Sequence, residues 1–252
     1  MQNISKLVFY CVVFIVLFIS KPGDLFSQSF GFGCLGLSGV YGGYSTQTFE
    51  AGGLNQTIIA RYENMGINNS DVSFGRASGL RLGANIFRAK FSNYFLTFKA
   101  FYQFLEEQHR RSHQISSVMY DDNYLLELNH WGVALDLGIP LFDFLDLKIV
   151  EGGMIFYNAE FSINSFVDGQ NQSEVKYKNS DTETGYYVGT GLIVHIIPDY
   201  ISLEGTAMYN FVQISRLETG NGDAIPYDTI TTNFIESGKV ATAVQLNIGF
   251  PL

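Results

Sequence analysis

One segment gathers the residue types that nucleophilic chemistry requires. His109 and His113 flank Ser112 within residues 108–116, and Ser117 follows directly. A histidine beside a serine hydroxyl is the pairing used in general-base-assisted hydrolysis. However, the spacing matches no known catalytic motif, and two histidines four residues apart share a metal only on a helix, which this Gln-, Arg- and Ser-rich segment does not favour. We therefore predict no catalytic residue, no metal site and no cofactor.

A second set of ionisable side chains is spread along the chain on the small, polar face of alternating segments. The set comprises Arg81, Lys99, Asp136, Glu151, Glu204 and Lys239. Three are basic and three are acidic, so they could neutralise one another if the fold brought them together. Unpaired charges away from water cost several kcal/mol each, which predicts a paired network. His130 and His195 fall on the same face and are expected to form hydrogen bonds beside it.

Elements with a two-residue period position these groups. Large apolar residues alternate with small or polar ones in residues 96–104, 130–139 and 239–250, a pattern typical of β-strands with two different faces. The pattern predicts eight strands, at residues 30–43, 78–89, 94–105, 124–139, 146–161, 185–197, 201–212 and 236–250.

The composition indicates which face points outward. Only 15% of residues are charged while 46% are hydrophobic, whereas soluble domains are about 25% charged. A water-facing sheet would need a dense charged face, and these segments have none. We therefore expect the large apolar face to meet lipid and the small, polar face to line a narrow interior. A lumen of eight strands is just wide enough for side chains to fill it. The charged set is then either a gate or proton path, or a structural plug, and the plug is favoured.

The connections alternate between short and long. Short ones are expected at residues 90–93, 140–145 and 198–200, and long ones at 44–75, 106–123, 162–183 and 213–235. Each long connection carries a net charge of −2. In the first of them Leu54, Ile58, Ile59 and Tyr62 have the spacing of a short amphipathic helix.

The N-terminus has the features of an export signal. An apolar run from Leu7 to Ile19 follows Lys6 and is too short to span a bilayer. We predict a secretory signal peptide at residues 1–27, with cleavage after Ser29 as the alternative, and one domain at residues 28–252. Removal of the signal leaves Cys34 without a disulfide partner. The net charge of −9 and the absence of a basic patch exclude a nucleic-acid partner.

With alternation such as that of residues 130–139, three short turns and an apolar final strand ending at Phe250, the chain resembles the small eight-stranded outer-membrane proteins of Gram-negative bacteria, of the OmpA/OmpX type. The resemblance implies an all-β, transmembrane antiparallel up-and-down β-barrel with long extracellular loops, in contact with outer-membrane lipid and lipopolysaccharide. We expect a structural or interaction role, possible partners being envelope proteins that bind the loops, with this chain as an accessory subunit of an envelope complex. A small-solute channel and a membrane-embedded lipid- or peptide-hydrolysing enzyme are the alternatives.

Overall fold

The computed structural model describes residues 38–67, 72–91, 93–115, 117–225 and 233–250. Its elements are β1 (Gly39–Glu50), α2 (Gly52–Asn64), β2 (Arg76–Lys90), β3 (Phe95–Gln103), β4 (Glu106–Ile115), β5 (Val118–Phe142), β6 (Leu145–Val167), β7 (Gln170–Lys178), β8 (Glu183–Ile197), β9 (Ile201–Phe211) and β10 (Ser237–Gly249). The expected signal peptide and Cys34 lie outside the described residues. Among the described residues, no helix has both the length and the apolar character needed to cross a membrane.

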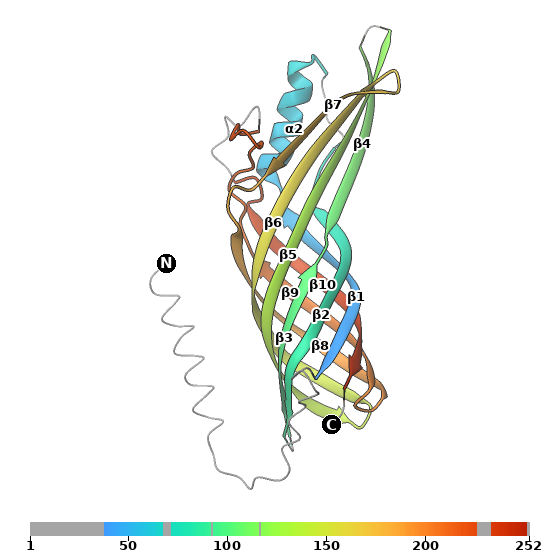
Figure 1. Ribbon diagram of the computed structural model, residues 1–252, viewed down its shortest axis with the longest axis vertical. Coiled ribbons are helices and arrows are strands. Elements are labelled where there is room, and N and C mark those ends of the chain that lie inside the picture. Colours follow the sequence, from blue (N-terminus) through green and yellow to red (C-terminus); the bar gives the residue numbers. More distant parts are fainter. Residues whose placement is uncertain (1–37, 68–71, 92, 116, 226–232, 251–252) are drawn as a thin grey trace, which may run out of the picture.

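Eight of the strands close into a ring. The order around it is β1, β2, β3, β5, β6, β8, β9 and β10, and each strand is antiparallel to both neighbours. Pairing of β1 with β10, from Gly39 opposite Gly249 to Glu50 opposite Ser237, closes the ring (Figure 1). The predicted eight-stranded up-and-down barrel is confirmed.

The faces of the barrel strands are inverted relative to a soluble sheet. On β10 the side chains of Ala241, Ala243 and Gln245 are buried, whereas Val244 and Leu246 are 56% and 44% exposed. The other barrel strands show the same exposed apolar residues on the outside, such as Leu80 on β2 and Leu135 on β5. An apolar exterior around a small, polar interior is the arrangement of a barrel that crosses a bilayer.

The long connections contain more regular structure than the sequence predicts. The segment expected as a loop at 106–123 forms β4 and the start of β5, which pair as a hairpin. The segment at 162–183 forms the end of β6 and all of β7. The first long connection contains α2, as predicted, with Leu54, Ile58 and Tyr62 buried. The first strand, expected at 30–43, is described from Gly39 to Glu50.

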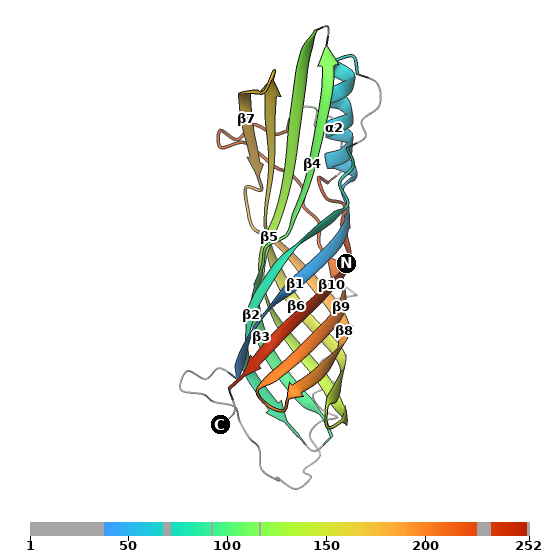
Figure 2. The same ribbon diagram turned by 90° about the vertical axis from the view of Figure 1, so that its right-hand side faces the viewer.

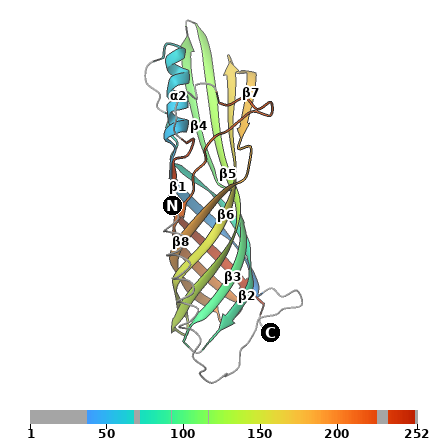
Figure 3. The ribbon, with the colours of Figure 1, turned by 90° about the vertical axis from the view of Figure 1, so that its left-hand side faces the viewer.

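Together these segments form a platform beyond the barrel. It consists of β4, the outer parts of β5 and β6, β7, and α2 (Figures 2 and 3), and Tyr62 of α2 contacts Asp122 and Tyr124 of β5. A bilayer needs only about 9 to 11 residues of each strand, whereas β5 has 25 residues and β6 has 23. Outer-membrane barrels have short periplasmic turns, so this platform is extracellular.

The polarity of both faces reverses where β5 leaves the membrane. Inward-facing Tyr124 and Leu126 are buried in an apolar core, but inward-facing Asp136 lies in a polar lumen. On the outer face, the polar Asn129 is the last residue before the apolar Trp131. Trp131 is exposed and stacks on Phe156 of β6 with ring centroids 4.2 Å apart. Aromatic rings favour the headgroup level, so this pair marks the outer boundary of the lipid-facing band.

Candidate functional site

Six ionisable side chains meet inside the barrel, and we call them the lumen network. They are Arg81 from β2, Lys99 from β3, Asp136 from β5, Lys148 and Glu151 from β6, and Glu204 from β9. All six are at most 3% exposed. Five belong to the set singled out from the sequence. Lys148 was not expected there.

A β-bulge explains why alternation missed Lys148. Ile149 and Val150 of β6 together oppose the single residue Thr190 of β8, because the pairing shifts between Lys148 and Glu151. Both apolar residues of the bulge are exposed on the lipid side. The extra residue changes the phase of the strand. As a result, Lys148 and Glu151 both point inward although they are three residues apart.

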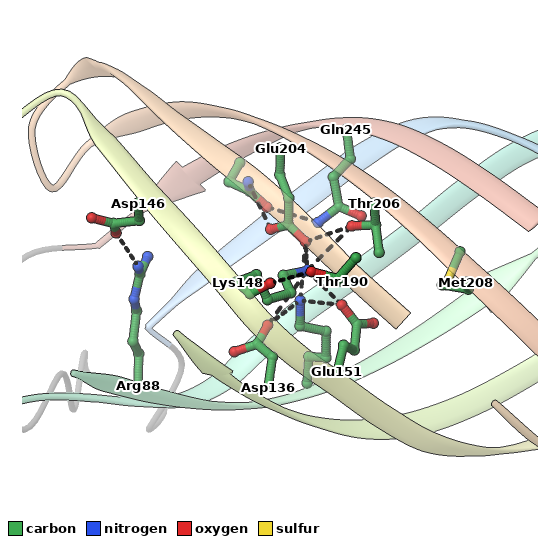
Figure 4. A network of polar contacts seen from close by, with 12 residues as sticks. Arg88, Asp136, Asp146, Lys148, Glu151, Thr190, Glu204, Thr206, Met208 and Gln245 are labelled. Carbon is green, nitrogen blue, oxygen red and sulfur yellow. Dashed lines mark hydrogen bonds and ion pairs between the residues drawn. The ribbon is translucent and has the colours of Figure 1, made fainter. Parts of the chain in front are cut away.

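The two lysines hold the three carboxylates together, and Figure 4 labels Lys148 among Asp136, Glu151 and Glu204. Lys99 Nζ lies 2.7 Å from an oxygen of Asp136 and 3.2 Å from one of Glu204. Lys148 Nζ lies 2.5 Å from Glu151 Oε2, contacts the Glu204 oxygen that Lys99 also binds, and is 3.7 Å from Asp136. With Arg81 the network carries three positive and three negative charges.

Neighbouring groups complete the network. The guanidinium of Arg81 lies 3.5 Å from Glu151 Oε1 and 4.1 Å from the centroid of the Phe101 ring. Tyr187 donates a hydrogen bond of 2.6 Å to the same Glu151 oxygen. Asn247 lies 3.4 Å from the second oxygen of Glu204. Strands from all sides of the ring therefore cross-link through these side chains, which is the geometry of a plug.

The carboxylates alone would also suit a cation. Ligand oxygens of Asp136, Glu151 and Glu204 lie within 4.8 Å of one another. In the structure, the ammonium groups of Lys99 and Lys148 already stand between these oxygens. A divalent ion would have to displace both lysines from a buried position, so the donor set does not fit a resident metal.

Lys239 does not lie in the lumen, contrary to expectation. Its side chain is 40% exposed and pairs with Glu50 Oε1 at 2.5 Å. The cause is a second bulge, in which Lys239 and Val240 of β10 oppose the single residue Thr48 of β1. The bulge turns Lys239 to the outer rim. Hydrogen bonds to Lys239 and Ser237 lower the pKa of the exposed Glu50.

The segment with nucleophilic residue types forms strand β4, and the strand separates its members. His109 and His113 face the inside of the platform, where His109 lies 3.0 Å from Glu107 Oε1. Ser112 is on the opposite face and donates a hydrogen bond to Asp121. Neither histidine is in reach of that hydroxyl, so no serine–histidine pair forms here.

The two other histidines lie within the barrel strands. His130 is buried, with Nδ1 3.2 Å from the Leu128 carbonyl oxygen. His195 Nε2 lies 2.8 Å from Asp146 Oδ2. Both therefore take part in hydrogen bonds on the interior face.

Beneath α2 a buried polar cluster fixes the helix to the sheet. Tyr62 of α2 donates to Asp122 Oδ2 at 3.2 Å and accepts a 2.9 Å hydrogen bond from Tyr124. Ser165 and Arg61 contact the other oxygen of Asp122, at 2.6 and 3.4 Å. Burial raises the pKa of Tyr62 to about 12 and also raises that of Tyr124. The cluster lies outside the membrane and makes the platform a firmly packed unit.

Comparison with solved structures finds similar chains of low sequence identity. Ail, the attachment invasion locus protein of Yersinia pestis, crystallised in complex with the heparin analogue sucrose octasulfate, is 13% identical with a TM-score of 0.39, over 84% of this chain and 97% of Ail. Neisserial surface protein A is 10% identical with a TM-score of 0.40, over 85% and 97%. The outer membrane protease OmpT from Escherichia coli is 9% identical with a TM-score of 0.39, over 85% and 94%.

No protein-family model matches the sequence, and no curated protein matches it either. The closed ring, the apolar exterior and the polar lumen are features of this chain itself. They identify an integral outer-membrane β-barrel protein.

Proposed function

We propose that the protein is a closed outer-membrane scaffold that presents its extracellular platform to another component of the cell envelope. The lumen network is the observation that carries this proposal. Six buried side chains from five strands meet across the interior, and their charges balance. A conducting pore would need water along the path that these side chains fill.

The platform supports the second half of the proposal. It has its own apolar core beneath α2, and its outer face is polar. Gln108 and Asn123 form a 2.9 Å hydrogen bond on that face, while Glu160 pairs with Lys178 at 2.8 Å. A rigid, hydrogen-bonding surface far beyond the bilayer suits recognition of a partner. The separation of Ser112 from His113 favours binding over hydrolysis as its role.

Single-channel recording of the refolded protein in planar bilayers tests the closed lumen. We expect no steady conductance from protein whose folding is verified by heat-modifiable mobility on a denaturing gel. Steady conductance that changes when Arg81 or Glu204 is neutralised would overturn the scaffold in favour of a small-solute channel.

Photo-cross-linking in cells tests the platform. A benzophenone side chain placed at position 108 or 123 should give one defined cross-linked product. The same group at Leu135, which faces lipid, is the matched control and should not give that product. Equal products from both surfaces, or none from the platform, would contradict a partner there.

A further inference from the structure

A pocket opens at the periplasmic end of the barrel, away from the lumen network. Its volume is about 530 Å³, and it lies among the short turns that follow β2, β5 and β8. Asp146 is one of its lining residues, and the Oδ2 atom of Asp146 lies 3.2 Å from Arg88 and 2.8 Å from His195 Nε2. Figure 4 shows this Arg88–Asp146 pair apart from the lumen network. The pocket is therefore separate from the lumen network and lies at the periplasmic end of the barrel.

Aromatic rings line much of this pocket. Phe91 and Tyr94 of the first short turn stack with ring centroids 4.4 Å apart. Phe95 and Phe142 also line it. The faces of such rings attract cations, most strongly where water is partly excluded.

The carboxylates of the pocket outnumber its cations. Lys90 is paired with Asp199, and the side chain of Arg88 is held by Asp146. Asp143 has no ion pair or hydrogen bond with any described residue. The side chain of Asp146 is 8% exposed, and its Oδ1 has no hydrogen-bond partner among the described residues. The exposed carboxylate of Asp143 and the Oδ1 atom of Asp146 can thus offer oxygens to a positive group in this pocket.

We propose that this pocket binds an organic ammonium cation that carries methylene or methyl groups. The ammonium would lie between Asp143 and Asp146, while its hydrocarbon part contacts Tyr94 and Phe142. A few polar groups that orient a ligand within apolar walls are the usual composition of a small-molecule site. The ammonium could belong to a free amine or to a lysine side chain of a periplasmic peptide.

Chemical-shift titration of the refolded barrel in micelles tests the proposal. Pentane-1,5-diamine should give saturable shifts of amides in the short turns, whereas pentane-1,5-diol, its uncharged analogue, should not. Asp143→Asn and Tyr94→Leu should each weaken binding about three- to tenfold, because each removes one attraction for the cation. Asp223→Asn, on an extracellular loop, is the matched control and should leave the affinity unchanged.

A second titration distinguishes the two sources of the ammonium. A short peptide that contains lysine should bind more tightly than the diamine if the natural ligand is a peptide, and less tightly if it is a free amine. Norleucine in place of lysine should abolish peptide binding. The proposal is overturned if neither amine gives saturable shifts, if the diol binds as well as the diamine, or if Asp143→Asn and Asp223→Asn behave alike.

Discussion

Replacement of Lys148 by Met should destabilise the barrel strongly. Methionine has a similar length but no charge, so the substitution removes the ammonium without leaving a large cavity. Lys148 is 0% exposed and its Nζ contacts Glu151, Glu204 and Asp136, together with Thr206 Oγ1 at 3.2 Å. The variant would hold three carboxylates within 4.8 Å against only two cations.

The expected loss is about 3–5 kcal/mol of the free energy of unfolding, which is typical when one partner of a buried ion pair is removed. That is a large share of the roughly 5–15 kcal/mol that stabilises an ordinary protein. With a dependence of about 2 kcal/mol per molar urea, the unfolding midpoint falls by about 2 M. Glu204→Gln in the same chain restores neutrality and should recover at least about 1 kcal/mol.

The assay is urea unfolding of the refolded barrel, followed by the fluorescence of Trp131, the single tryptophan of the chain. Lys239→Met is the matched control, because Lys239 is exposed and its pair with Glu50 should contribute only about 0–1 kcal/mol. A Lys148→Met variant within 1 kcal/mol of the wild type, or an equal loss from Lys239→Met, would show that the buried contacts of Lys148 do not stabilise the barrel.

Three further predictions concern the platform and the barrel wall. Burial lowers the pKa of His113 below its ordinary value of 6.5. As the pH falls below 6.5, the unfolded state therefore binds more protons than the folded state, and the packing beneath α2 should weaken. Hydrogen exchange of α2, corrected for intrinsic rates, should be faster at pH 5 than at pH 7, and His113→Phe should remove the difference. Ile58→Ala should cost about 2–5 kcal/mol of packing and expose α2 to protease, while the barrel keeps its heat-modifiable mobility; unchanged protection would contradict the docking described for α2. A Cβ at Gly43 would lie 2.2 Å from the Val244 carbonyl oxygen, whereas one at Gly205 would meet nothing within 4 Å, so urea unfolding should show a loss of about 1–3 kcal/mol for Gly43→Ala and little change for Gly205→Ala.

The barrel could be predicted from the sequence because its two faces differ so strongly. Side chains that face lipid are apolar and those that face the lumen are small or polar, so the two types alternate along β5 and β10. Strand β4 shows no such alternation. Its outward Gln108 and Arg110 are polar, and so are its inward His109 and Arg111. The inward pair packs through ring and stem contacts, with Arg111 4.3 Å from the centroid of the Tyr62 ring, and these depend on α2 already being in place.

The number of charges in the lumen network and five of its six residues were predictable, and bulges explain why the sixth residue was not. A prediction from alternation assumes that every second residue faces inward. One extra residue in a bulge exchanges the inward and outward faces for the rest of the strand. The bulge at Ile149 brings Lys148 into the lumen, while the bulge beside Thr48 turns Lys239 out to Glu50. The two changes leave the sum of interior charges at zero. A buried excess of either sign would cost several kcal/mol, so the low-dielectric interior constrains the balance of charges even where backbone irregularities decide which lysine supplies one of them.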